Sequence, residues 1–407
     1  MKRIVNIVLI SIIAILTFTP IIGYFPFFRR TWIFLLLGLC AIACMQKTYH
    51  LHKGFLFLGG SMIIMFLNAL SHDKYYSTIN SVLVEISMIV LASTMFLFSK
   101  NRNYGAEFLK WAVYTTFGII AIEVVASFIL DLEYPGIIRA LFSESITSGE
   151  REELMYPYYR MGLTNYILPH AVPMLIPPLI MGIREKRLSL WIRLWGGFFL
   201  FFVLLLVWLS GVMTAFLLSL ISIIFTLFIA KGKIVNLKLF IGLFILILPF
   251  IIFDDLTLYV IQILKSLFSG NGFIKYKLEL LEESLLMQQS TGDLEERQNL
   301  YMISINEFTN NILIGSNNPM GNHSMFLDRL ATLGIIGFIP YIAFYYFQLT
   351  IVRKIMAPQY LLYYDQAVIL GLLMMALKGI TSWEIFFTLF MVMPSLFVFL
   401  SSKINAK

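Results

Sequence analysis

His323, the only histidine between residues 254 and 332, is the best candidate in this sequence for acid–base chemistry. An imidazole changes protonation near neutral pH and can act as a general base. Asn322 is expected to cap a helix, which would place His323 in the first helical turn. The positive end of a helix favours the neutral imidazole that a base requires. A histidine with only a structural role in a turn is the alternative, and the spacing alone leaves both open.

Arginines near the expected membrane boundaries could bind phosphate, and these are Arg160, Arg297 and Arg329. A planar guanidinium group matches phosphate oxygens in a bidentate geometry. Each arginine also has acidic neighbours in sequence, such as Glu296 or Asp328, so an ion pair within the protein is the structural alternative. Arg160 and Arg297 are the better candidates, because both stand beside aromatic residues, as a site for a lipid-linked sugar would require.

The sequence has no motif for a metal or a nucleotide. It lacks a Gly-rich Lys-Ser/Thr phosphate loop, a His-Glu-x-x-His motif and the Cys/His spacing of metal sites. The only two cysteines, Cys40 and Cys44, are one helical turn apart and are interpreted as packing residues. We therefore expect no metal site and no cofactor. Neither a nucleotide-driven pump nor a zinc protease is supported.

The elements that must position these residues lie in the long polar segment 254–332. Residues 273–289 mix leucines with charges in a pattern typical of a helix at a membrane surface. The next helix is expected to begin at Asp293, which resembles an N-cap with Glu296 three residues further on, and to end at Asn310-Asn311. Three- and four-residue spacing puts a set of side chains on one face of that helix. This set is Arg297, Tyr301, Ser304 and Phe308.

The rest of the chain has the composition of a membrane protein. Hydrophobic residues make up 59% and charged residues 13%, with a mean hydropathy of +0.85, whereas a soluble domain has roughly a quarter charged residues. Lipid cannot satisfy backbone polar groups, so apolar runs of this length must be helices. We expect an all-α polytopic protein in which residues 1–407 form one transmembrane domain of about twelve spans. The expected spans are 4–25, 31–46, 54–70, 79–98, 108–130, 162–183, 190–208, 211–230, 237–253, 333–351, 363–380 and 383–400.

The distribution of charge predicts the orientation. The net charge is +7, but basic residues are scattered among short joints and form no patch, so no nucleic-acid partner is expected. With the N-terminus inside, most basic residues fall on the cytoplasmic side and the outer segments are net acidic. We therefore expect both termini in the cytoplasm and the external loops 131–160 and 254–332 outside. Loops of this length in a compact protein are usually functional.

A few ionisable residues are expected inside or at the edge of the spans, namely Glu85, Glu123, Lys378 and Glu384. Such residues usually mark function or an internal pair. A Glu–Lys pair that holds helices together is the structural alternative. His170 lies in a span with several prolines, which is expected to kink because each proline removes a backbone donor.

Two stretches of the chain carry a family resemblance. The longer one comprises Arg297, Tyr301 and residues 311–315, 321–324 and 333–338. The other comprises Arg160, Gly162 and Asn165, which enter the expected sixth span. Both resemble the bacterial O-antigen and capsular polysaccharide polymerase (Wzy-type) and O-antigen ligase superfamily. The number of spans and the long outer loop between the ninth and tenth are also similar.

The resemblance implies a metal-independent glycosyltransferase with a GT-C-like fold in the bacterial inner (plasma) membrane. Its substrate would be an undecaprenyl-pyrophosphate-linked oligosaccharide among the membrane lipids. His323 matches the family's loop histidine, to which activation of the acceptor hydroxyl is ascribed. Arg160 and Arg297 match family arginines to which binding of the pyrophosphate is ascribed. Contacts to the same substrate are expected from Arg329, Tyr301 and Asn322.

We therefore expect a polysaccharide polymerase that joins lipid-linked repeat units, for lipopolysaccharide or capsule, on the outer face of the membrane. A chain-length regulator is a candidate partner. The first alternative is an O-antigen ligase, which transfers a finished glycan to another acceptor and would use the same motifs. The second is a lipid-linked oligosaccharide flippase, which would have charged residues concentrated within its spans and only short loops.

Overall fold

The computed structural model describes part of the 407-residue chain. The described residues are 8, 11, 57, 59–61, 63, 89, 92, 105–133, 153, 168–210, 212–228, 254–267, 275–276, 278–279, 282–283, 293–316, 318, 320–378 and 383–405. The expected spans 31–46 and 237–253, both cysteines, Glu85 and Arg160 lie outside them. The expected spans 4–25, 54–70 and 79–98 lie mostly outside them.

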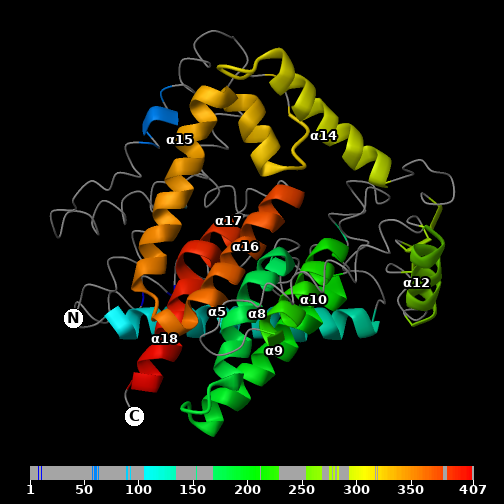
Figure 1. Cartoon of the computed structure of the whole chain (residues 1–407). Coiled ribbons are helices and arrows are strands. Elements are labelled where there is room, and N and C mark those ends of the chain that lie inside the picture. Colours follow the sequence, from blue (N-terminus) through cyan, green and yellow to red (C-terminus); the bar gives the residue numbers. More distant parts are fainter. Residues whose placement is uncertain are drawn as a thin grey trace.

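Helices make up the regular structure of the described residues, which contain no strand (Figure 1). The α-helices up to residue 310 are α5 (Gly105–Glu133), α8 (Leu168–Arg184), α9 (Leu190–Ser210), α10 (Met213–Phe228), α12 (Asp254–Leu267) and α14 (Asp293–Asn310). The later elements are α15 (Met325–Ile355), the short 3-10 helix η2 (Pro358–Tyr360), α16 (Leu361–Lys378), α17 (Trp383–Phe387), the π-helix η3 (Thr388–Val392) and α18 (Met393–Asn405).

Five helices of the described part are long and apolar enough to cross a membrane. They span Leu109–Leu132, Leu190–Ser210, Met325–Lys354, Pro358–Leu377 and Glu384–Ile404. Each overlaps a span expected from the sequence. The chain is therefore an all-α membrane protein in the part that the structure describes. Helix α10 is apolar but shorter, over Thr214–Leu227.

Helix α8 forms the centre of the bundle. It is buried from Leu168 to Gly182 and packs against α9, α10, α16 and α18. The prolines Pro173, Pro177 and Pro178 lie inside this helix, which continues from Leu168 to Arg184. A helix surrounded by other helices tolerates such prolines when neighbours satisfy the freed backbone groups.

Ser222 of α10 supplies one of these substitute bonds. Pro177 has no N–H, so it cannot donate to the carbonyl of Pro173 one turn earlier. The Ser222 hydroxyl donates to that carbonyl at 3.1 Å, and both groups are buried. At the end of the same helix, Arg184 donates to the carbonyls of Thr226 and Leu227, each at 3.0 Å. Helices α8 and α10 are thus joined at two levels.

Helix α15 is divided at Gly334, which has φ 58° and ψ −177°. Figure 1 shows a short first segment at one end of the bundle and a long second segment that runs along it. The division coincides with residue 333, where the sequence predicts the start of a span. The N-cap is Ser324, whose hydroxyl accepts from the N–H of Leu327 at 3.4 Å.

The prediction that Asn322 caps this helix is therefore wrong. Asn322 has φ 56°, a left-handed conformation that asparagine tolerates better than most residues. His323 consequently precedes the N-cap and does not lie in the first helical turn. An effect of the helix dipole on its imidazole does not follow from this geometry, because that effect is confined to the terminal turn.

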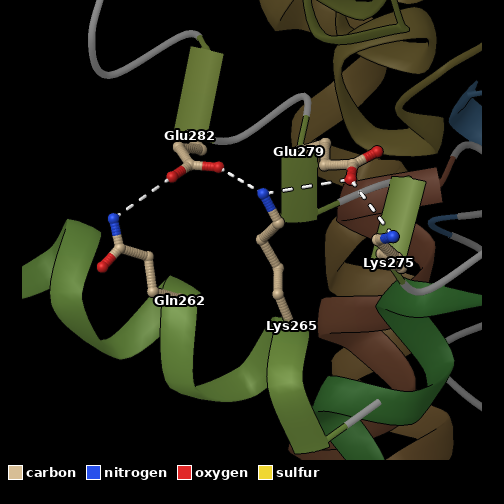
Figure 2. Close-up of polar contacts among 5 residues, drawn as sticks. All are labelled: Gln262, Lys265, Lys275, Glu279 and Glu282. Carbon is tan, nitrogen blue, oxygen red and sulfur yellow. Dashed lines mark hydrogen bonds and ion pairs between the residues drawn. The ribbon is translucent and has the colours of Figure 1, made fainter. Parts of the chain in front are cut away.

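Helix α12 contacts the segment for which the sequence predicts a surface helix, 273–289. The described residues of that segment are helical. Lys265 of α12 donates to Glu282 at 2.6 Å, and its ammonium lies 3.9 Å from the Glu279 carboxylate. Figure 2 shows both contacts. The hydrogen bond from Lys265 holds the pKa of Glu282 below its ordinary value. The same bond raises the pKa of Lys265.

The C-terminal helices form a largely buried wall of the bundle. The π-helix η3 is buried throughout and joins α17 to α18. Such wide turns are rare and occur often at functional sites.

Glu384 in α17 interacts electrostatically with Glu123 in α5, which is 3% exposed. The expected pairing of a glutamate with Lys378 is not tested, because the Lys378 side chain lies outside the described residues.

Candidate functional site

The candidate site is built on α14, the turn 311–324 and the first segment of α15. Helix α14 lies across one end of the bundle, beyond the ends of α16 and α17 (Figure 1). Its bounds, Asp293–Asn310, are those expected from the sequence. The chain then turns back, and the first segment of α15 packs against α14.

Two glycines with positive φ hold the turn against the division in α15. Gly315 has φ 81° and Gly334 has φ 58°. A Cβ atom on Gly315 would collide with the carbonyl of Thr332, and one on Gly334 would collide with the carbonyl of Leu313. Only glycine allows both the conformation and this close approach.

Backbone hydrogen bonds connect residues 312–316 of the turn to residues 331–336 of α15. Ser316 donates to Ala331 at 2.8 Å, Ile335 donates to Ile312 at 2.9 Å and Ile336 donates to Leu313 at 3.1 Å. These bonds satisfy amides at the break in α15, where the regular helical pattern is interrupted. The turn after α14 and the start of the long helix are therefore one rigid unit.

Ser304 and Asp328 connect α14 to α15 beneath this turn. The Ser304 hydroxyl donates to Asp328 Oδ1 at 2.6 Å and accepts from the N–H of Gly321 at 3.1 Å. The Asp328 carboxylate also accepts backbone bonds from Asn322 and Ser324. A Cβ atom on Gly321 would collide with the carbonyl of Leu300 in α14.

The backbone is thus bonded to Asp328 on both sides of His323. The His323 side chain is half-buried, and its ring lies against Tyr301 of α14. The ring centroids are 6.1 Å apart with an interplanar angle of 67°, an edge-to-face arrangement. Tyr301 in turn donates its hydroxyl to the carbonyl of Leu377 at 2.8 Å. Since Leu377 ends a candidate span, Tyr301 connects the histidine to the membrane-embedded bundle.

The predicted phosphate-binding arginines have different positions. Arg297 lies four residues before Tyr301 in α14, on the same helical face, and its side chain is outside the described residues. Arg329 is 5% exposed and interacts electrostatically with Asp328. This fits the structural alternative, in which the arginine forms an ion pair with an acidic residue of the protein. Arg160 lies outside the described residues. The structure therefore brings His323 and Tyr301 together and places Asn322 beside them, with an exposed side chain.

Some residues that form the site were not singled out from the sequence. Glu307 of α14 accepts from Ser316 at 2.8 Å and from the side chain of Asn318 at 2.9 Å, which fixes the turn. From the sequence, Asp328 is indicated only as a partner of Arg329. Ser304 is buried, and a buried hydroxyl requires a hydrogen-bond partner, which here is Asp328.

The chemistry available here is proton transfer by an imidazole on a well-fixed backbone. Among the residues that the structure describes, no group of three His, Cys, Asp or Glu side chains could hold a metal ion. A hydroxyl group of a bound molecule could donate its proton to His323, with the Tyr301 ring as one wall.

The fold and this site define a helical membrane protein with an ordered polar unit at one end of its bundle. Comparison with models of protein families, with curated proteins and with solved structures finds no match.

Proposed function

We propose that this protein is a metal-independent glycosyltransferase of the GT-C-like kind, with about twelve spans. It joins lipid-pyrophosphate-linked oligosaccharide repeat units on the outer face of the bacterial plasma membrane. The observation that carries the proposal is the fixed position of His323, against Tyr301 and between two backbone groups bonded to Asp328. This unit lies at the end of helices that are long enough to span a membrane, where a lipid-linked substrate would present its head group.

The reaction is a displacement at an anomeric carbon. A hydroxyl of one lipid-linked repeat unit attacks the anomeric carbon of a growing chain and forms the new glycosidic bond. The bond from that carbon to the pyrophosphate oxygen breaks, and the lipid pyrophosphate leaves with the electron pair. His323 takes the proton of the attacking hydroxyl. Because the donor is already activated, positioning, a base and charge stabilisation are sufficient.

The other residues have roles that follow from their places. Arg297 would hold the pyrophosphate from the face of α14 that also carries Tyr301, and Arg160 would approach from the external loop 131–160. Tyr301 offers an apolar ring face on which a sugar can pack. Asn322, exposed next to His323, can exchange hydrogen bonds with sugar hydroxyls. Arg329, which is buried beside Asp328, would act through that carboxylate by keeping the His323 backbone in place.

Reconstitution with a single substrate tests the proposal. The purified full-length chain in vesicles receives one lipid-linked repeat unit and no other acceptor, and the products are separated by size. A polymerase produces a ladder of lengths. A ligase produces no ladder under these conditions but transfers glycan when a second acceptor is added. Absence of glycosyl transfer with every acceptor would exclude both enzymes.

A further inference from the structure

An apolar cavity lies at the other end of the bundle from the candidate site, between α5, α8, α9 and α18. Its volume is about 310 Å³. Its wall consists of aliphatic side chains and five aromatic rings, and the rings belong to Tyr114, Phe117, Trp195, Phe199 and Phe399. This composition suits a hydrocarbon chain and offers almost no polar group to any other ligand.

The cavity reaches the surface of the described bundle at two of these aromatic residues. Tyr114 is 45% exposed and Trp195 is 54% exposed, although both line the cavity. By contrast, Leu179 and Leu396 in its depth are buried. A chain-like ligand can therefore enter from the side, as a lipid would from the surrounding bilayer.

Two lysines stand at the same wall. The ammonium of Lys110 lies 5.2 Å from the ring centroid of Tyr114, and that of Lys403 lies 6.0 Å from the ring centroid of Phe399. The two rings contact each other edge to face, with centroids 5.8 Å apart. Both cations are therefore next to the same aromatic pair, and this pair forms part of the cavity lining.

We propose that this cavity binds an anionic phospholipid, with an acyl chain among the apolar side chains and the phosphate between Lys110 and Lys403. A neutral hydrocarbon would not use the lysines, and a free phosphate would not use the cavity. The lysines lie at the start of α5 and the end of α18, on the side where the sequence predicts the cytoplasm. Anionic lipids of the cytoplasmic leaflet attract basic residues at this level.

The site is independent of the proposed glycosyl transfer. It lies on different helices from His323 and involves none of the residues of that site. The ligand expected at this site is a phosphodiester lipid such as phosphatidylglycerol, whose single negative charge matches the ammonium groups of Lys110 and Lys403.

Native mass spectrometry of the purified full-length chain tests the site, with dioleoylphosphatidylglycerol, dioleoylphosphatidylcholine or inorganic phosphate as probes. The wild type should retain phosphatidylglycerol about tenfold better than phosphatidylcholine, since each lysine near an anionic surface is worth several-fold in binding. Inorganic phosphate in excess should not displace the lipid. Equal retention of the two lipids, or displacement by phosphate alone, would overturn the proposal.

Charge variants separate these lysines from basic residues in general. Lys110→Gln combined with Lys403→Gln should lower the preference for phosphatidylglycerol to about twofold or less. The matched control is Lys186→Gln combined with Lys354→Gln, which removes the same charge at exposed positions that do not line the cavity. If the control loses the preference equally, the attraction is a general surface effect and the site is wrong.

Filling the cavity gives a readout that does not depend on charge. Ile192 lines the cavity in the first turn of α9, so Ile192→Trp should reduce retention of both lipids about fivefold by occupying the space of the chain. Leu194→Trp, at a 55% exposed position of the same helix, is the matched control and should retain the wild-type pattern. Unchanged lipid retention in a folded Ile192→Trp protein would contradict binding in the cavity.

Discussion

The Ser304 hydroxyl and the Asp328 carboxylate meet at 2.6 Å in the buried contact between α14 and α15. The same hydroxyl accepts from the N–H of Gly321, so one side chain connects α14, the turn and α15. The fixed backbone around His323 depends on this contact, because Asp328 also binds the amides of its two neighbours.

Replacement of Ser304 by alanine should destabilise the protein by about 1–3 kcal/mol, because it leaves the N–H of Gly321 and one oxygen of Asp328 without their bond in a buried place. Thermal unfolding in detergent measures the effect. Thr309→Ala in the same helix is the control, since its hydroxyl donates to a carbonyl at an exposed position. Equal stability of the two variants would show that the contact does not hold the unit together.

Gly334→Ala should prevent correct packing of the turn on α15 and reduce the amount of folded protein severely. The new Cβ would collide with the carbonyl of Leu313, and the positive φ would be strained as well. Gly118→Ala is the matched control, because a Cβ there meets nothing within 4 Å inside a regular helix. Size-exclusion profiles of both variants measure the amount of folded protein. Normal folding of Gly334→Ala would contradict the close backbone contact.

Ser222 and Pro177 should be energetically coupled. Ser222→Ala alone should cost about 1 kcal/mol, since it removes the substitute bond to the Pro173 carbonyl. In a Pro177→Ala background the restored N–H can bind that carbonyl, so the same serine change should cost little. A double-mutant cycle on thermal stability measures the coupling. Ser219→Ala, at a buried hydroxyl of the same helix, is the control. Strict additivity of the Ser222→Ala and Pro177→Ala effects would refute the coupling between these two residues.

The contact between α12 and residues 275–283 should depend on pH. The pKa of Glu282 is lowered from 4.5, so its contribution is present above that value and is lost as the pH falls through the lowered one. The pKa of Lys265 is raised from 10.5, so its contribution is present below that value and is lost as the pH rises through the raised one. The contact should therefore weaken in acid below about pH 4 and in strong alkali.

Spin labels at the exposed positions Tyr259 and Glu283 can measure this contact in a chain whose own cysteines are replaced by serine. Their distance distribution should be narrow at about pH 6 and broad at about pH 3. The variant Lys265→Gln should be broad at both values. A distribution that is narrow at both values in the wild type would show that other contacts hold the two segments together.

The sequence predicts much of this site because its signals are local. The start of α14 at Asp293 and its end at Asn310 are close to the limits that an aspartate and a pair of asparagines predict, and the face with Tyr301 and Ser304 follows from helical spacing. The sequence does not distinguish Ser324 from Asn322 as the cap, because both residue types suit that position. The choice depends on Asp328, which binds the backbone from the next helical turn.

Longer-range relationships could not be read from the sequence. The need for glycine at 321 comes from the carbonyl of Leu300, and the need at 315 comes from Thr332. Both depend on how α14 folds back on α15. The apolar cavity likewise combines residues from four helices.

The most direct test of the central claim is the yield of polymer from the His323→Ala protein, reconstituted in vesicles with one lipid-linked repeat unit. Loss of a general base predicts a decrease of about 10²–10⁴-fold in the rate of chain growth, with normal insertion and thermal stability. Met302→Ala, at an exposed position of α14, should produce the wild-type ladder. A His323→Ala protein that makes polymer at the wild-type rate would contradict the role of this histidine in glycosyl transfer.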